Sequence, residues 1–157
     1  MHRRDLGLLT LRLAVGGTLA AHGLPKLVGG PERTPPAWLA RIAGSNYPAA
    51  WEQGGPQSFA ATLTKLGVPW PRASAYAAGL AEFGGGIAIA AGLMSPRANL
   101  AVAANMAVAA RAAHWKTGFY GQGGYEFAFV LGAAALGLAV TGPGALSLDQ
   151  LRGRSRA

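Results

Sequence analysis

The chain has 157 residues, of which 51% are hydrophobic and only 13% are charged, and its formal net charge is +8. Ordinary soluble domains carry about a quarter charged residues, so this composition argues against a water-surrounded fold and favours one small membrane domain. Cysteine is absent, which excludes disulfides and thiolate chemistry within the chain. The basic residues flank apolar blocks, so we attribute them to membrane boundaries and anionic lipid and expect no nucleic-acid partner.

The first apolar run covers residues 6–27 and is long enough to cross a membrane. Arg12 interrupts its centre, which favours an uncleaved helix over a signal peptide. His22 and Lys26 lie four residues apart and therefore share one side of the helix. Pro25 lies between them and has no N–H to donate, so we expect the helix to kink or end there. Simple snorkelling of Lys26 and capping by His22 remain the alternative interpretation.

Residues 28–71 form a long outer connection whose seven prolines rule out a single crossing helix. Its scattered aromatic residues favour the membrane interface. One short helix is predicted, starting at Ser58 as N-cap and ending at Gly67. The connection could be a lid over a pocket or a plain connector.

The second predicted span, residues 73–94, contains a single charged residue, Glu82. A helix of that length measures roughly 33 Å, so Glu82 lies near the middle of a bilayer. Its helical neighbours are mostly small, which suits close packing against another helix. We therefore expect Glu82 to point into a bundle towards a partner; a helix buried in a soluble core is the alternative. The neighbours are Ala75, Ala78, Gly79, Gly85, Gly86 and Ile89.

The third and fourth spans are predicted at residues 97–113 and 125–141. Ser95 is the expected N-cap of the third, and Arg111 and His114 come at its far end. Glu126 falls in the first turn of the fourth span, where the helix dipole would stabilise its carboxylate even without a partner.

A basic tail, residues 142–157, follows the fourth span. Four spans place both termini on one side of the membrane. Short segments on that side are rich in arginine, so we place the termini in the cytoplasm of a multi-pass protein.

These expectations combine into an all-α, four-transmembrane-helix bundle with an outward-opening polar pocket. Spans of this length put Arg12 and Glu82 about 6 Å apart in depth, so we expect them to form a structural ion pair. A quinone headgroup needs hydrogen-bond donors, and carboxylates could relay protons; Glu82, His22 and His114 are the catalytic candidates. No metal-ligand spacing is recognisable, so we expect no metal site. The candidate binding residues are His22, Lys26, Glu82, Arg111, His114 and Glu126.

Several segments in order resemble the DoxX family of small four-helix bacterial membrane proteins. They are LRLAVGGTLAAHGLPKL (11–27), GLAEFGGG (79–86), GLMSPRANLA (92–101), GYE (124–126) and TGPGALSLDQL (141–151). The resemblance implies a four-helix fold in the bacterial plasma membrane and an association with redox chemistry. Relatives include the membrane subunit of an archaeal thiosulfate:quinone oxidoreductase and proteins thought to tether soluble oxidative-stress or sulfur-metabolism enzymes. The family-like polar positions are Arg12, His22, Lys26, Glu82, His114 and Glu126. Residues 31–57 are longer than the family pattern.

Three functions remain open at this point. The chain could be a quinone-binding subunit of an oxidoreductase assembly, without a covalent cofactor of its own. It could instead be a scaffold that anchors soluble redox or sulfur-metabolism enzymes, or a small-solute or proton carrier with Glu82 as the titrating site. Faces of small residues also allow a homo-oligomer.

Overall fold

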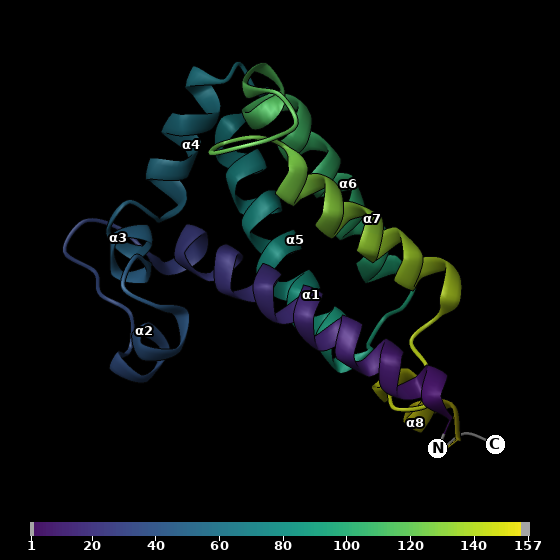
Figure 1. Cartoon of the computed structure of the whole chain (residues 1–157). Helices are drawn as coiled ribbons and strands as arrows, with labels where there is room; N and C mark the ends of the chain where they lie inside the picture. The colour runs from purple at the N-terminus through teal and green to yellow at the C-terminus, as the bar shows by residue number, and fades with distance from the viewer. Residues whose placement is uncertain (1, 155–157) are drawn as a thin grey trace.

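Four long helices form the body of the protein in a computed structural model that describes residues 2–154 (Figure 1). They are α1 (Arg3–Val28), α5 (Pro71–Ala91), α6 (Arg97–Ala109) and α7 (Glu126–Thr141), and α6 continues into a π-helical turn, Ala110–His114. No strand occurs in the described residues, which confirms the all-α prediction. Among the described residues, α1 alone is both long and apolar enough to cross a membrane, judged by length and composition, while α7 is apolar but shorter.

Three short helices replace the single one predicted between residues 28 and 71. They are α2 (Ala37–Ala43), α3 (Tyr47–Glu52) and α4 (Pro56–Lys65), and together we call them the arm. Ser58 does not cap α4: Gly55 takes the N-cap position and Pro56 starts the helix. The prolines that argued against one long helix thus begin short ones instead.

Helix ends depart from the prediction where glycine or a distant side chain intervenes. The second long helix stops at Ala91 because Gly92 adopts φ +66°, a conformation that terminates helices. Ser95 does not cap α6 either, since its hydroxyl accepts a hydrogen bond from Asn99. Its backbone N–H donates instead to Asp149 at 2.8 Å. Asp149 lies on α8 (Leu148–Arg154), a helix the sequence analysis missed.

Direct backbone contact joins α1 to α5. A Cβ on Gly16 would overlap the carbonyl oxygen of Gly86, and one on Gly86 would lie 2.7 Å from the carbonyl oxygen of Gly16. Further along, Gly23 faces Glu82 with equally little room. Glycines let helix backbones approach this closely, as the small-residue face of the second span predicted. Because Gly16 meets Gly86 and Gly23 meets Glu82, the two helices run antiparallel, and these contacts fix their register.

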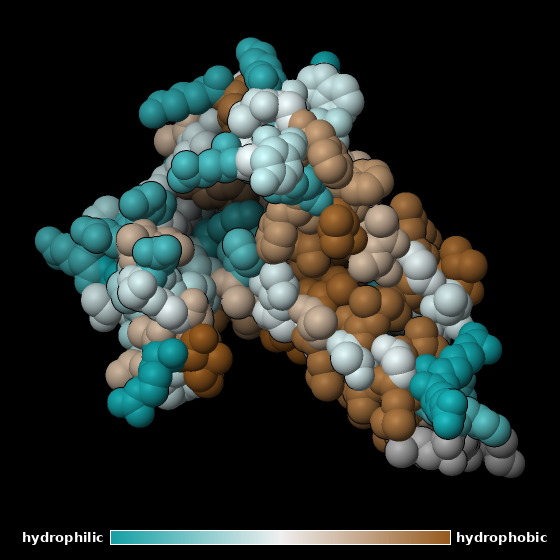
Figure 2. Space-filling model, in the orientation of Figure 1, coloured by the Kyte–Doolittle hydropathy of each residue, from teal (hydrophilic) through white to brown (hydrophobic). Residues whose placement is uncertain are grey.

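The core lies between these four helices, and the outside of the bundle is also apolar. Leu19, Ile89 and Val102 are at most 2% exposed. Many large apolar side chains on the same helices nevertheless face outwards, including Val140 at 88% and Leu80 at 58% exposure. Figure 2 shows this surface as a brown expanse over the bundle, with teal at its ends and on the arm. Such an extended apolar exterior suits lipid or partner helices better than water.

The α1–α5 contact makes a prediction about one methyl group. Gly16→Ala should destabilise the protein by about 1–3 kcal/mol, because the methyl group must displace backbone atoms of α5. Gly17→Ala is the matched control: nothing lies within 4 Å of its Cβ position, so better helix propensity should leave stability equal or slightly higher. Denaturation in mild detergent measures both variants. Equal stability of the two would contradict the proposed backbone contact.

Candidate functional site

A bidentate ion pair joins the last turn of α1 to α5. The Lys26 Nζ atom lies 2.6 Å from each carboxylate oxygen of Glu82, and Glu82 is only 4% exposed. Asn105 on α6 adds a hydrogen bond to Glu82 Oε1 at 3.3 Å. A carboxylate this deeply buried is tolerated when a cation and hydrogen bonds compensate its lost hydration. Three helices thus converge on one carboxylate.

The predicted pairing of Arg12 with Glu82 is wrong. Arg12 is 3% exposed and donates to two backbone carbonyls, that of Pro143 and, at 2.5 Å, that of Leu146. Depth counted from span boundaries could not reveal the register between helices. In the structure Gly23 lies opposite Glu82, which leaves Lys26 one turn further on to reach the carboxylate.

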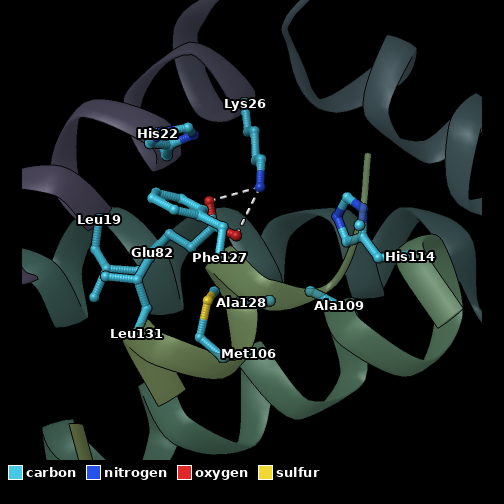
Figure 3. Close-up of a pocket in the computed structure, with 11 residues that line it drawn as sticks. Leu19, His22, Lys26, Glu82, Met106, Ala109, His114, Phe127, Ala128 and Leu131 are labelled. Atoms are coloured by element: carbon cyan, nitrogen blue, oxygen red, sulfur yellow. Dashed lines mark hydrogen bonds and ion pairs between the residues drawn. The ribbon is translucent and has the colours of Figure 1, made fainter. Parts of the chain in front are cut away.

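Two small cavities flank the ion pair. The first has a volume of about 130 Å³, and His22, Lys26, Glu82 and His114 line it. Figure 3 shows these four side chains around the apolar wall. The second cavity has about 160 Å³ and shares Lys26, Glu82 and His114 with the first. The apolar wall of the first cavity includes Leu19, Met106, Phe127 and Leu131.

The two histidines offer different chemistry to the first cavity. The His22 ring packs against Phe127 at 5.3 Å between ring centroids. His114 Nδ1 lies 2.9 Å from the carbonyl oxygen of Gly123, which can only accept, so Nδ1 carries the proton. In the neutral ring Nε2 is then an acceptor, whereas the sequence analysis counted His114 as a donor. The π-helical turn that contains His114 has no signal in the sequence; such turns are frequent at functional sites.

Arg111 and Glu126 stand apart from these cavities. Neither is among the residues that line the two cavities beside the ion pair. Arg111 is exposed, and Glu126 accepts a long hydrogen bond of 3.4 Å from the N–H of Gly121. Glu126 occupies the first turn of α7, the position where a helix dipole stabilises a carboxylate without a partner.

Two residues that contribute to the site, Asn105 and Phe59, were not predicted from the sequence. Asn105 was visible as an amide in the middle of an apolar helix, which was a usable signal for a buried partner. Phe59 on α4 came from the connection, where nothing marked it; its ring centroid lies 4.9 Å from Lys26 Nζ. This cation–π contact brings the arm to the ion pair.

Pro25 lies inside α1 rather than at its end. Because it cannot donate to the carbonyl of Ala21, that oxygen needs another partner, and the Tyr47 hydroxyl donates to it at 2.9 Å. The carbonyl of Pro25 itself accepts from the N–H groups of Gly29 and Gly55. The arm is therefore anchored at the backbone irregularity next to Lys26.

Comparison with known proteins gives a family match. The DoxX family model matches residues 7–115, more than half of the chain, and confirms the resemblance noted in the sequence. No curated protein and no solved structure matches the chain. Among residues 2–154 no group of three or more histidine or acidic side chains could hold a metal ion.

Removing one member of the ion pair should cost more than removing both. Lys26→Met leaves the Glu82 carboxylate buried without a cation, and we expect a loss on the order of 3 kcal/mol. The double variant Lys26→Met with Glu82→Gln removes the lone charge and should regain most of that loss. Denaturation in detergent gives the free energy of unfolding of Lys26→Met, of Glu82→Gln and of the double variant. If the losses of the two single variants add up to the loss of the double variant, the two side chains do not interact.

The Tyr47 hydroxyl should contribute measurably to stability. Tyr47→Phe leaves the Ala21 carbonyl without a partner beside Pro25, so a loss of about 1 kcal/mol is expected. Tyr76→Phe, on the exposed face of α5, serves as control and should be neutral. Thermal unfolding of both variants gives the comparison, and an unchanged midpoint for Tyr47→Phe would count against this anchor.

Proposed function

Because the chain belongs to the DoxX family, whose members are membrane proteins often linked to redox systems, we propose that it is a multi-pass membrane subunit that binds a quinone or a similar lipid-soluble molecule. The observation that carries the proposal is the Lys26–Glu82 ion pair beside an otherwise apolar cavity. Sites for apolar ligands combine hydrophobic walls with a few convergent polar groups.

The polar groups match both redox forms of such a ligand. An ammonium has three protons, and two of those on Lys26 go to Glu82, so the third is free for a ligand carbonyl. His114 Nε2 can accept from a ligand hydroxyl, the group that a reduced ring carries. Leu19, Met106 and Phe127 supply the wall against which a flat ring would pack. The chain holds no cysteine, so a soluble partner would supply any further redox centre.

Four crossings of the bacterial plasma membrane accompany this proposal. The apolar outside of α1, α5, α6 and α7 supports it, although α7 has only 16 residues and α6 only 13 before its π-helical turn. The start of α1 and the whole of α8 lie at one end of the bundle (Figure 1), as an even number of crossings requires. We place that arginine-rich end in the cytoplasm.

A scaffold without chemistry of its own is the second candidate. Its support is α2, which buries none of its residues and exposes Trp38 at 65% and Ile42 at 78%. A soluble redox or sulfur-metabolism enzyme could dock there. A carrier has less support, because a transported solute would need a path along the whole bundle. Backbone contact between Gly16 and Gly86 blocks such a path between α1 and α5, and the buried side chains of Leu19 and Ile89 fill the adjoining core.

Ligand binding should appear as thermal stabilisation in lipid nanodiscs. A short-chain quinone at about 100 times its Kd should add roughly 2.7 kcal/mol, by mass action. The Lys26→Met and Glu82→Gln double variant should lose that gain. Lys65→Met is the matched control, since this exposed lysine on α4 lies outside the cavities beside the ion pair, and should keep it.

The contrary outcome is specific. No stabilisation of the wild-type protein by benzoquinones or naphthoquinones would refute the ligand proposal. If the wild-type protein bound no quinone but still captured a soluble enzyme, and deletion of residues 31–57 abolished that capture, the protein would function as a scaffold.

A further inference from the structure

A third and larger cavity adjoins the ion pair on the side of the arm. Its volume is about 490 Å³, and we call it the vestibule. Its walls come from α1, the end of α2, α3 and α4, with Ala43 and Ala50 among the arm residues. Figure 2 shows the surface hollowed between the arm and the bundle.

The vestibule shares lining residues with both smaller cavities. His22 and Lys26 line the vestibule and the cavity beside Phe127. Lys26, Phe59 and Thr62 line the vestibule and the cavity on the other flank. Lys26 thus lines all three spaces.

The volumes of the three cavities indicate different roles for them. Ligand sites commonly measure about 300–1,000 Å³, a range that the vestibule reaches and that neither smaller cavity does. A single ring can lie against Lys26, but any side chain on that ring needs further room. We propose that the vestibule holds the side chain of the ligand whose head binds at Lys26; this inference rests on the proposed function.

The lining of the vestibule specifies an uncharged, mostly apolar side chain. Its walls include Ala21, Pro25 and Ala50. Lys26 lies in its lining, and Glu82 already balances the charge of this lysine. Gln53 and Thr62 add polar edges, and Thr62 donates its hydroxyl proton to the Ser58 carbonyl at 3.2 Å, which leaves its oxygen as an acceptor. An isoprenoid chain fits these walls, whereas an anionic headgroup finds no free cation there.

Backbone hydrogen bonds and close backbone contacts hold the arm in place beside α1. Gly30 donates to the carbonyl of Trp51 at 2.8 Å, and Gly55 donates to that of Pro25 at 2.8 Å. A Cβ on Gly54 would overlap the Pro25 carbonyl, so the chain passes directly against α1 at this point. These contacts hold the vestibule open beside Lys26. The segment that exceeds the family pattern, residues 31–57, supplies one side of this space.

The test fills the vestibule and compares two ligands. Ala50→Trp places a large ring within it, while Ala49→Trp puts the same ring on the same helix at an exposed position outside the lining. Nanodisc-embedded protein is titrated with a quinone that lacks a side chain and with the same quinone carrying a short isoprenoid chain. Wild type and Ala49→Trp should bind the chain-bearing form at least about 10-fold tighter, because burial of about two methylene groups gives that factor.

Ala50→Trp should reduce the affinity for the chain-bearing form to that for the bare ring. An unchanged ratio of the two affinities in Ala50→Trp overturns this inference and leaves the proposed function standing. Failure of the wild type to bind either quinone refutes both. If Ala50→Trp also loses the bare ring, Ala43→Trp decides from α2: selective loss supports the vestibule, and an unchanged ratio overturns it.

Discussion

A carboxylate inside an apolar bundle requires compensation, and the rest of this structure is arranged around that requirement. Glu82 obtains it from Lys26 at 2.6 Å and from Asn105 at 3.3 Å. A cation on α1 can reach α5 in this way only if the two helices approach closely. Gly23 makes the approach possible, because any side chain at that position would collide with Glu82 and Phe83. The ion pair therefore depends on the close approach of α1 and α5 that these glycines permit.

The same two helices explain why the cavities lie at one end. Near Gly16 and Gly86 their backbones touch, and no space for a ligand remains between them. Towards the arm α1 and α5 diverge, as Figure 1 shows, and α4 packs against α5 through Ala60, Leu63 and Ala75. Phe59 and Lys26 meet across the resulting gap. Tight packing at one end and an inserted helix at the other produce a bundle that is accessible from one side.

The sequence predicted what depends on composition and spacing, and it missed what depends on register. Apolar runs located four long helices, and the small face around Glu82 predicted an inward carboxylate. His22, Lys26, Glu82 and His114, which the sequence brings from three predicted spans or their ends, line one cavity. The partner of Glu82 was misassigned because span boundaries do not determine how far one helix slides along another. Short helices such as α3 and α8 escaped because their stability comes from contacts with distant residues, such as Ala21 for Tyr47 and Ser95 for Asp149.

Two cations within the bundle, the half-buried Lys26 and the buried Arg12, are compensated for lost hydration in different ways. Lys26 is neutralised by a carboxylate and keeps one proton free at a cavity. Arg12 is held by the carbonyls of Pro143 and Leu146, so its charge is solvated by dipoles but not cancelled by a carboxylate within the described residues. Its guanidinium ties the segment after α7 onto α1 and adds positive charge to the end of the bundle where α1 begins and α8 lies. The two ends of the bundle therefore differ: at one end Arg12 holds the segment after α7 against α1, and at the other end cavities adjoin a lysine whose charge a carboxylate cancels.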